Sequence, residues 1–386
     1  MTESFDIVNY PENRESEQRL FQLIESGKAI LFIGSGSSRR LGYPSWEGIL
    51  NDLKDLSDNE SVITLVEQKI NDGDLLLAAE IIKNKITFEQ YNLKFEEFFK
   101  AKEPPYDDFH RLLMKVKFKG FVTTNYDPII EYALKSIQNP HSNYDIIISK
   151  KNKSFVHYFL NSVINSVNWN ERFHLYLHGK YNDSTSTILS YGDYVLKYHG
   201  LNIKEQILYK DLIAGTIDIK NFESKTDLKN CAFRTLHYKT IYLLMATQRI
   251  VFLGFGLKDP YLIKIIDDIK DDFSPGYKPN HYVLFSQNEA NSLTTPDYLI
   301  KKKEWKDKGI ELVFYKDDDS YSGIEQLVKE LSPDSFIAPS IKPHHDDDKM
   351  VAEDETLVDI KKIEDKSINE KLISKVKKTA EELKKK

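Results

Sequence analysis

The sequence is poor in three features that would each direct it to a particular class of protein. It holds a single cysteine, Cys231, which excludes an internal disulfide framework and a zinc site built from four cysteines. No apolar run reaches the roughly 18 residues of a membrane-spanning helix, and the polar, acidic N-terminus is unlike a signal peptide. The net charge of −6 gives no overall basic excess for nucleic acid. We therefore expect a cytoplasmic protein, outside the membrane, with no zinc.

What the sequence does hold is a series of short apolar segments separated by helical patterns. Hydrophobic residues make up 40% of the chain, enough for a large core. Apolar runs predict strands at residues 29–33, 120–124, 146–148, 173–177, 249–253, 281–285 and 310–314. Continuous apolar runs are typical of strands buried on both faces of a parallel sheet. Their alternation with helices predicts an α/β fold, a Rossmann-like doubly wound parallel sheet with helical insertions.

Composition divides the chain near residue 335. Residues 1–335 are predicted to form one nucleotide-binding catalytic domain, which opens with an extended arm to residue 15 and a helix at 16–27. Helical periodicity predicts an inserted block at about 59–101 and a second helical region at about 190–248. Residues 336–386 are predicted to be a charged linker followed by an amphipathic helical tail. That tail is either an interface or a solvated helix.

Two glycine turns follow predicted buried strands. They are Gly34-Ser35-Gly36, continued by Ser37 and Ser38, and Gly254-Phe255-Gly256. Glycine lets a backbone approach a pyrophosphate, and an adjoining helix N-terminus supplies N–H donors. Arg39 stands where the usual dinucleotide motif has its third glycine, so the first turn also fits a tight strand-to-helix connection without a ligand. The recurrence of the pattern after a second strand favours a nucleotide.

A polar set follows two further predicted strands. Thr124, Asn125 and Asp127 come after one strand, and His178 comes after another. Ligands in such sheets lie beyond the carboxyl ends of the strands, so these groups are expected beside the glycine turns. An asparagine amide offers both a donor and an acceptor, and a histidine serves as a general base near neutral pH. Taken singly, Asn125 and Asp127 fit an Asx-turn cap, and His178 fits a buried, hydrogen-bonded imidazole.

Together these groups fit the cleavage of an N-glycosidic bond. A neutral amide such as nicotinamide is a good leaving group, so the site needs chiefly to stabilise an oxocarbenium-like ribose and to position a nucleophile.

In order and approximate spacing, the motifs Gly34 to Ser38, Thr123 to Asp127, His178-Gly179 and Gly254 to Leu257 resemble those of the sirtuin family. The resemblance covers about residues 20–330. It implies that the first turn holds the NAD pyrophosphate, that Asn125 contacts the ribose and a water, and that His178 is the general base. It also implies that Asp127 supports the nicotinamide pocket and that the late turn contacts the adenosine ribose.

Three departures separate the chain from sirtuins that deacylate proteins. It lacks their two Cys-x-x-Cys pairs, it has Tyr43-Pro44-Ser45-Trp46 in place of their Ile-Pro-Asp-Phe-Arg segment, and it carries the helices at 59–101. It therefore resembles the sirtuin-like branch of bacterial anti-phage systems, whose members deplete NAD by hydrolysis. The segment from Ser190 to Tyr194 is also similar to that branch, although it equally fits a helix start.

The resemblance implies a homo-oligomer with a protein partner. Chains of this length without a fused sensor resemble the partner of a HerA-type ATPase, while others accompany short Argonaute proteins or signalling-nucleotide sensors. The leading hypothesis is an NAD glycohydrolase, with NAD as substrate. The alternatives are a non-catalytic NAD or ADP-ribose sensor or scaffold for a motor ATPase, an NAD-dependent protein deacylase, and nucleic-acid binding through Lys301 to Lys303 and the tail lysines.

Overall fold

A parallel sheet of seven strands, in the order β3-β4-β2-β1-β5-β6-β7, forms the centre of the structure. This computed structural model describes residues 6–138, 145–148, 152–165, 169, 171–183, 185–199, 235–257, 259–273, 281–290, 295–316 and 321–331. The strands are β1 (Ala29–Ile33), β2 (Phe118–Thr123), β3 (Asp145–Ile147), β4 (His174–Tyr176), β5 (Arg249–Leu253), β6 (His281–Ser286) and β7 (Ile310–Tyr315). Every predicted strand is present, so the doubly wound parallel sheet is confirmed.

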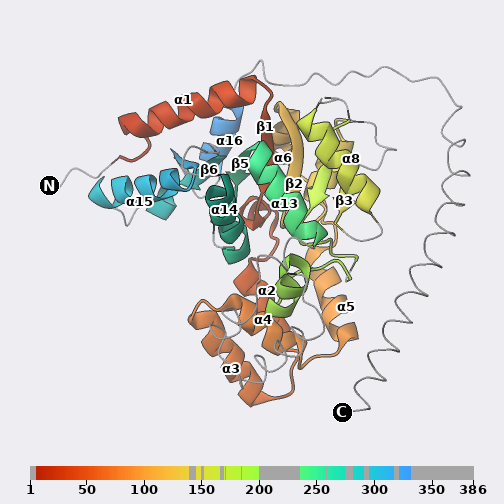
Figure 1. Ribbon diagram of the computed structural model, residues 1–386. Coiled ribbons are helices and arrows are strands. Elements are labelled where there is room, and N and C mark those ends of the chain that lie inside the picture. The colour runs from red at the N-terminus through yellow and green to blue at the C-terminus, as the bar shows by residue number, and fades with distance from the viewer. Residues whose placement is uncertain are drawn as a thin grey trace, which may run out of the picture. The chain divides into compact units, whose positions relative to one another are not determined.

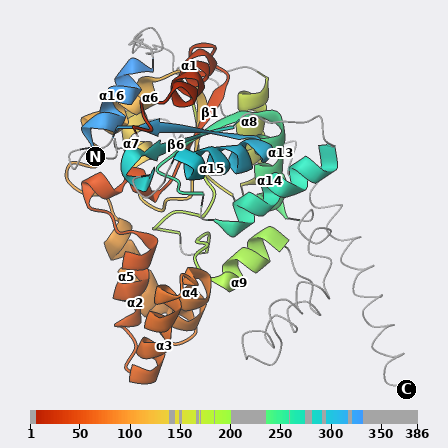
Figure 2. The same ribbon diagram turned by 90° about the vertical axis from the view of Figure 1, so that its left-hand side faces the viewer.

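Both faces of the sheet are covered, which explains why the strands are continuously apolar. In β1, Ala29, Leu31 and Ile33 enter one hydrophobic core, while Ile30 and Phe32 enter the other. The first core is closed by helices α1 (Pro11–Glu25), α6 (Asp108–Lys115), α7 (Ile129–Lys135) and α16 (Ser322–Glu330). The second is closed by α8 (Lys153–Ile164), α13 (Leu236–Thr247), α14 (Pro260–Phe273) and α15 (Thr295–Asp307). Figures 1 and 2 show the helices on both sides of the strands.

The predicted insertion is a block of helices between β1 and β2. Within the predicted bounds of about 59–101 lie α3 (Glu60–Asn71), α4 (Leu75–Lys83) and α5 (Phe88–Phe99). They gather in Figure 1 with α2 (Trp46–Lys54), which precedes those bounds. Helix α4 also packs against α9 (Tyr191–Tyr194), a short helix that continues into the π-helical turn η3 (Val195–His199). The insertion therefore contacts the segment that follows His178.

Two predictions at the ends of the chain have different outcomes. The N-terminal helix begins at Pro11, not at residue 16, so the prediction that residues 11–15 belong to an extended arm is wrong. Pro11 stands at the start of the helix, where the fixed φ of proline favours helix initiation. The predicted tail and residues 200–234 of the second helical region, which include Cys231, lie outside the described residues.

The strand order places a topological switch at the centre of the sheet. Strands β1 and β5 are neighbours, with Ile33 paired to Leu253. The chain leaves β1 toward helices of the first core and leaves β5 toward α14 of the second core. Connections that diverge in this way open a crevice beyond the carboxyl ends of the two strands, where ligands bind in such folds. Both glycine turns lie at this point.

Candidate active site

The two glycine turns interlock. The Gly34 N–H donates to the carbonyl of Leu253 at 2.8 Å, and the Gly36 N–H donates to that of Gly254 at 2.9 Å. A Cβ on Gly34 would collide with the Gly254 oxygen, and one on Gly254, whose φ is +62°, would lie 2.5 Å from the Ser37 nitrogen. Each position must therefore be glycine because the backbone of the other turn leaves no space for a Cβ. The sequence alone did not indicate this reason.

The serines of the first turn differ in what they face. Ser35 is exposed, whereas Ser37 and Ser38 are buried. The Ser37 hydroxyl donates to the Gly34 carbonyl at 2.9 Å, and the Ser38 hydroxyl donates to the Asp127 carboxylate at 2.8 Å. The turn continues into two short 3-10 turns, η1 (Ser35–Ser37) and η2 (Arg39–Leu41). The next α-helix begins only at Trp46, with Ser45 as its N-cap, so the turn does not lead directly into an α-helix.

Asn125 crosses from the end of β2 to the first glycine turn. Its side-chain nitrogen donates to the Gly34 carbonyl at 3.1 Å and to the Ser38 hydroxyl at 3.0 Å. Because a carbonyl oxygen only accepts, these bonds fix which end of the amide is nitrogen. The remaining amide oxygen, Oδ1, is buried and has no hydrogen-bond partner among the described residues. A buried acceptor left unpaired costs about 1–3 kcal/mol, which a donor on a bound molecule would recover.

Asp127 supports Asn125 through Ser38. One carboxylate oxygen accepts the Ser38 hydroxyl, and the other accepts the Ile129 N–H at 3.2 Å at the start of α7. Burial raises the pKa of Asp127, while the bonds from Ser38 and Ile129 oppose the rise. Asp127 therefore forms the expected Asx-type turn with the Ile129 N–H, whereas the Asn125 side chain binds the first glycine turn. Thr124, between β2 and Asn125, is half-buried.

His178 lies beside Asn125 at the end of the neighbouring strand. Thr123 pairs with Tyr176, and the Leu177 N–H donates to the Thr123 carbonyl at 2.8 Å, so each of the two polar residues lies two positions beyond that pair. The His178 ring is buried, and its Nε2 is 3.0 Å from the Tyr198 hydroxyl. Burial lowers the pKa of His178 to about 3, which leaves the imidazole neutral at pH 7.

Tyrosines and one buried carboxylate surround His178. Asp259 Oδ2 is 3.7 Å from His178 Nε2 and accepts the Tyr194 hydroxyl at 2.8 Å. Burial raises the pKa of Asp259, whose other oxygen accepts the N–H groups of Tyr261 and Leu262 at the start of α14. Sequence reasoning missed Asp259 and Tyr198. The pair Asp259-Pro260 is typical of a helix start, so the sequence could indicate that Asp259 caps a helix. It could not indicate that Asp259 lies beside His178.

The second glycine turn divides into a core part and an exposed part. The Phe255 ring lies 5.0 Å from that of Phe32 and 5.6 Å from that of Phe252, so its side chain packs against the second core. Gly256 is exposed. The exposed Gly256 presents backbone without a side chain, which suits contact with a ribose or a pyrophosphate.

The predicted site residues thus fall into one connected group. Hydrogen bonds join the first glycine turn to Asn125, Ser38 and Asp127, and the sheet holds His178 alongside. A separate cavity of about 330 Å³ lies between α4, α5 and α9. Among the described residues, no group of three or more His, Cys, Asp or Glu is placed to hold a metal ion. No helix in the same part of the chain has both the length and the apolar character needed to cross a membrane.

Comparison with known families gives one match to a domain model. Residues 119–313 match the model described as a SIR2-like domain. The matched region contains Asn125, Asp127, His178 and the second glycine turn. It begins after the first glycine turn, which the structure nevertheless joins to the rest of the site.

Curated relatives carry the name NAD(+) hydrolase ThsA. The protein of Enterococcus faecium is 24% identical over 292 residues, which cover 74% of this chain and 49% of that protein. The protein of Cytobacillus dafuensis is 21% identical over 279 residues, covering 72% of this chain and 45% of its own length. This chain therefore spans about half the length of these relatives.

Proposed function

The chain belongs to the SIR2-like domain family, and from that premise we propose that it binds NAD and hydrolyses the bond between nicotinamide and ribose. The names of the curated relatives support this activity. The observation that carries the proposal is the buried Oδ1 of Asn125 beside the two glycine turns, which has no hydrogen-bond partner in the part of the chain that the structure describes. A ribose hydroxyl or a water is a donor of the kind this oxygen lacks.

In the proposed reaction, the bond from ribose C1′ to the nicotinamide nitrogen breaks and its electron pair leaves with nicotinamide. Water attacks C1′ and gives ADP-ribose, while His178 takes the proton of that water. Asn125 orients the ribose or the water, and Asp127 holds Ser38 and thereby the Asn125 amide. A positioned general base contributes about 10²–10⁴ in rate. The low pKa of His178 makes it a weaker base than an exposed histidine, so we expect the lower end of that range.

The glycine turns are proposed to bind the rest of NAD. Gly34, Ser35 and Gly36 would meet the pyrophosphate, with Thr124 beside them, and Gly254 and Gly256 would meet the adenosine ribose. Ser37, Ser38 and Phe255 would act by holding the turns in shape, because their side chains are engaged within the protein.

The test is release of nicotinamide and ADP-ribose from NAD, measured by chromatography with the purified chain. Asn125→Ala and His178→Ala should each reduce turnover by about 100-fold or more. His157→Ala, at an exposed position on α8, should match wild type. NAD binding is measured separately by calorimetry. Full turnover in both site variants would contradict the proposal, and binding by wild type without turnover would indicate a sensor.

The biological setting is proposed on the resemblance alone. We propose that the chain is a cytoplasmic effector of bacterial anti-phage defence that depletes NAD, as a homo-oligomer partnered by a HerA-type ATPase. We also propose that residues 1–335 form the catalytic domain and 336–386 a separate tail. Mass photometry of the chain with and without the ATPase, and NAD levels in infected cells, test these points directly.

A further inference from the structure

Residues 188–199, here called the bridging segment, contact His178 and the neighbour of Asn125. The Ile188 N–H donates to the His178 carbonyl at 3.0 Å, and the Ile188 carbonyl accepts the hydroxyl of Tyr126, the neighbour of Asn125, at 2.5 Å. At the other end of the segment, the Tyr198 hydroxyl lies 3.0 Å from His178 Nε2. The position of the segment therefore decides what surrounds the imidazole.

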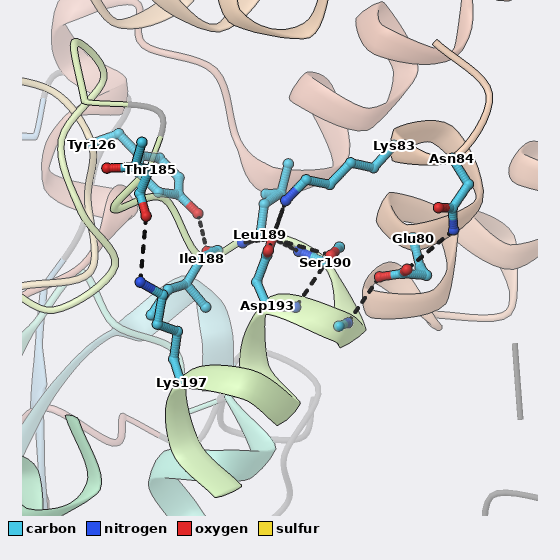
Figure 3. Close-up of polar contacts among 11 residues, drawn as sticks. Glu80, Lys83, Asn84, Tyr126, Thr185, Ile188, Leu189, Ser190, Asp193 and Lys197 are labelled. Carbon is cyan, nitrogen blue, oxygen red and sulfur yellow. Dashed lines mark hydrogen bonds and ion pairs between the residues drawn. The ribbon is translucent and has the colours of Figure 1, made fainter. Parts of the chain in front are cut away.

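Helix α4 of the insertion holds the middle of the bridging segment (Figure 3). Lys83 Nζ lies 2.7 and 2.8 Å from the two carboxylate oxygens of Asp193. One turn earlier, Glu80 accepts the Gly192 N–H at 2.8 Å, and Asn84 donates to the other oxygen of the same carboxylate at 3.1 Å. Glu80 is buried, while Lys83 and Asp193 are partly exposed, with 31% and 16% of their side-chain surfaces accessible.

Asp193 makes the ion pair and the helix cap with one carboxylate. It accepts the N–H groups of Leu189 and Ser190 at 3.2 and 3.0 Å, within a capping box at the start of α9. Helix α9 has four residues, too few to be stable without tertiary contacts. The cavity of about 330 Å³ lies where α4 and α5 meet α9, so the side chains at this contact are not closely packed.

We propose that Lys83 and Glu80 are positioning residues for His178, which act through Asp193 and Tyr198. The inference rests on the proposed function, since it assumes that His178 is the base. The inserted helices would then set the catalytic geometry of a site to which they contribute no reacting group. A displacement of about 1 Å in a catalytic group lowers rates by up to about 10²-fold.

An ion pair with a purely structural role would affect the free energy of unfolding and not kcat specifically. Partly exposed pairs add little to global stability, so the loss of Lys83 should leave the fold intact. The effect should therefore appear in kcat, with little change in KM, because the glycine turns do not contact Lys83. Arginine should restore the function, since its guanidinium pairs with a carboxylate through two bonds.

The kinetic test compares Lys83→Ala, Lys83→Arg and Lys94→Ala in NAD hydrolysis. Lys94 is the matched control, because it lies in the same insertion and its ion pair, with Glu97 at 3.1 Å, stays within α5. We expect Lys83→Ala to lower kcat by about 5–50-fold with KM changed by less than about threefold. Lys83→Arg should stay within about threefold of wild type, and Lys94→Ala should be unchanged. An unchanged kcat in Lys83→Ala would overturn the proposal, as would equal losses in Lys83→Ala and Lys94→Ala.

Hydrogen exchange separates this inference from the proposed function. Amides of the bridging segment should exchange at least about tenfold faster in Lys83→Ala than in wild type or Lys94→Ala, measured by mass spectrometry without NAD. This readout does not depend on turnover. If wild type fails to hydrolyse NAD, the proposed function fails, while the exchange still reports whether α4 holds the segment. Unchanged exchange in Lys83→Ala would overturn the coupling itself.

Discussion

The contact between the two glycine turns can be tested by adding one methyl group. Gly254→Ala introduces a Cβ 2.5 Å from the Ser37 nitrogen and 3.1 Å from the Gly36 carbonyl carbon. These are backbone atoms, so they cannot move aside as a flexible side chain would. Gly254 also has φ +62°, in the left-handed region that disfavours alanine. Two independent costs therefore fall on the same substitution.

The structure provides a position that separates these costs. The left-handed conformation costs about 1–2 kcal/mol for a residue with a Cβ. Forcing atoms into a packed site adds about 1–3 kcal/mol. We therefore expect Gly254→Ala to lower the free energy of unfolding by about 2–5 kcal/mol. Gly73 has φ +77°, and a Cβ added there would meet nothing within 4 Å, so Gly73→Ala should lose about 1–2 kcal/mol only.

The assay is urea unfolding followed by circular dichroism, with wild type and both variants compared by midpoint and slope. The difference between the two variants isolates the clash between the turns. A Gly254→Ala protein no less stable than Gly73→Ala would refute the interlocked geometry. Calorimetry with NAD adds a second readout, because only Gly254→Ala should also weaken binding.

Two further predictions concern buried and partly buried charges. Arg172 is buried and donates to the carbonyls of Met114, Val116 and Phe118. Arg172→Ala should therefore lower the free energy of unfolding in urea by about 3–5 kcal/mol. The control Arg111→Ala, at an exposed position, should change it almost not at all. Burial raises the pKa of Asp107, but the hydrogen bond and charge of His110 and the charge of Arg40 outweigh it and hold the pKa at about 2, below the ordinary 3.8. The stabilisation by Asp107 is thus present above about pH 4 and disappears as the pH falls toward 2. The free energies of unfolding of wild type and Asp107→Asn should therefore converge over that pH range. A difference that stays constant with pH would contradict the prediction.

The sheet could be predicted because its strands are buried on both faces. A run such as residues 29–33 carries no polar residue and ends at a glycine turn, as expected of a strand buried on both faces. Helix α15 has no comparable signal, since its lysines interrupt any apolar stripe, and no helix was predicted there. The predicted start of α1 was wrong because its first turn is polar and carries no apolar periodicity to mark it as helical.

The residues of the candidate site could be proposed from the sequence, but the contacts between them could not. Asn125, His178 and the glycine turns were recognisable because each follows a strand. The pairing of β1 with β5 joins residues far apart in the sequence, and no local pattern encodes that contact. The same holds for Asp259, Tyr198 and Lys83, single polar residues whose roles depend on what the fold brings beside them.

The central position of β1 has a consequence for the order in which the protein can be made. Ala29 pairs with Arg249, so residues 30–248 must emerge from the ribosome before this pair can form. Until then, the first glycine turn cannot form its hydrogen bonds to the second, and the crevice is absent. A nascent chain therefore carries Asn125 and His178 before its two glycine turns can come together. For a protein proposed to consume NAD, we therefore expect chains that end before β5 to be inactive.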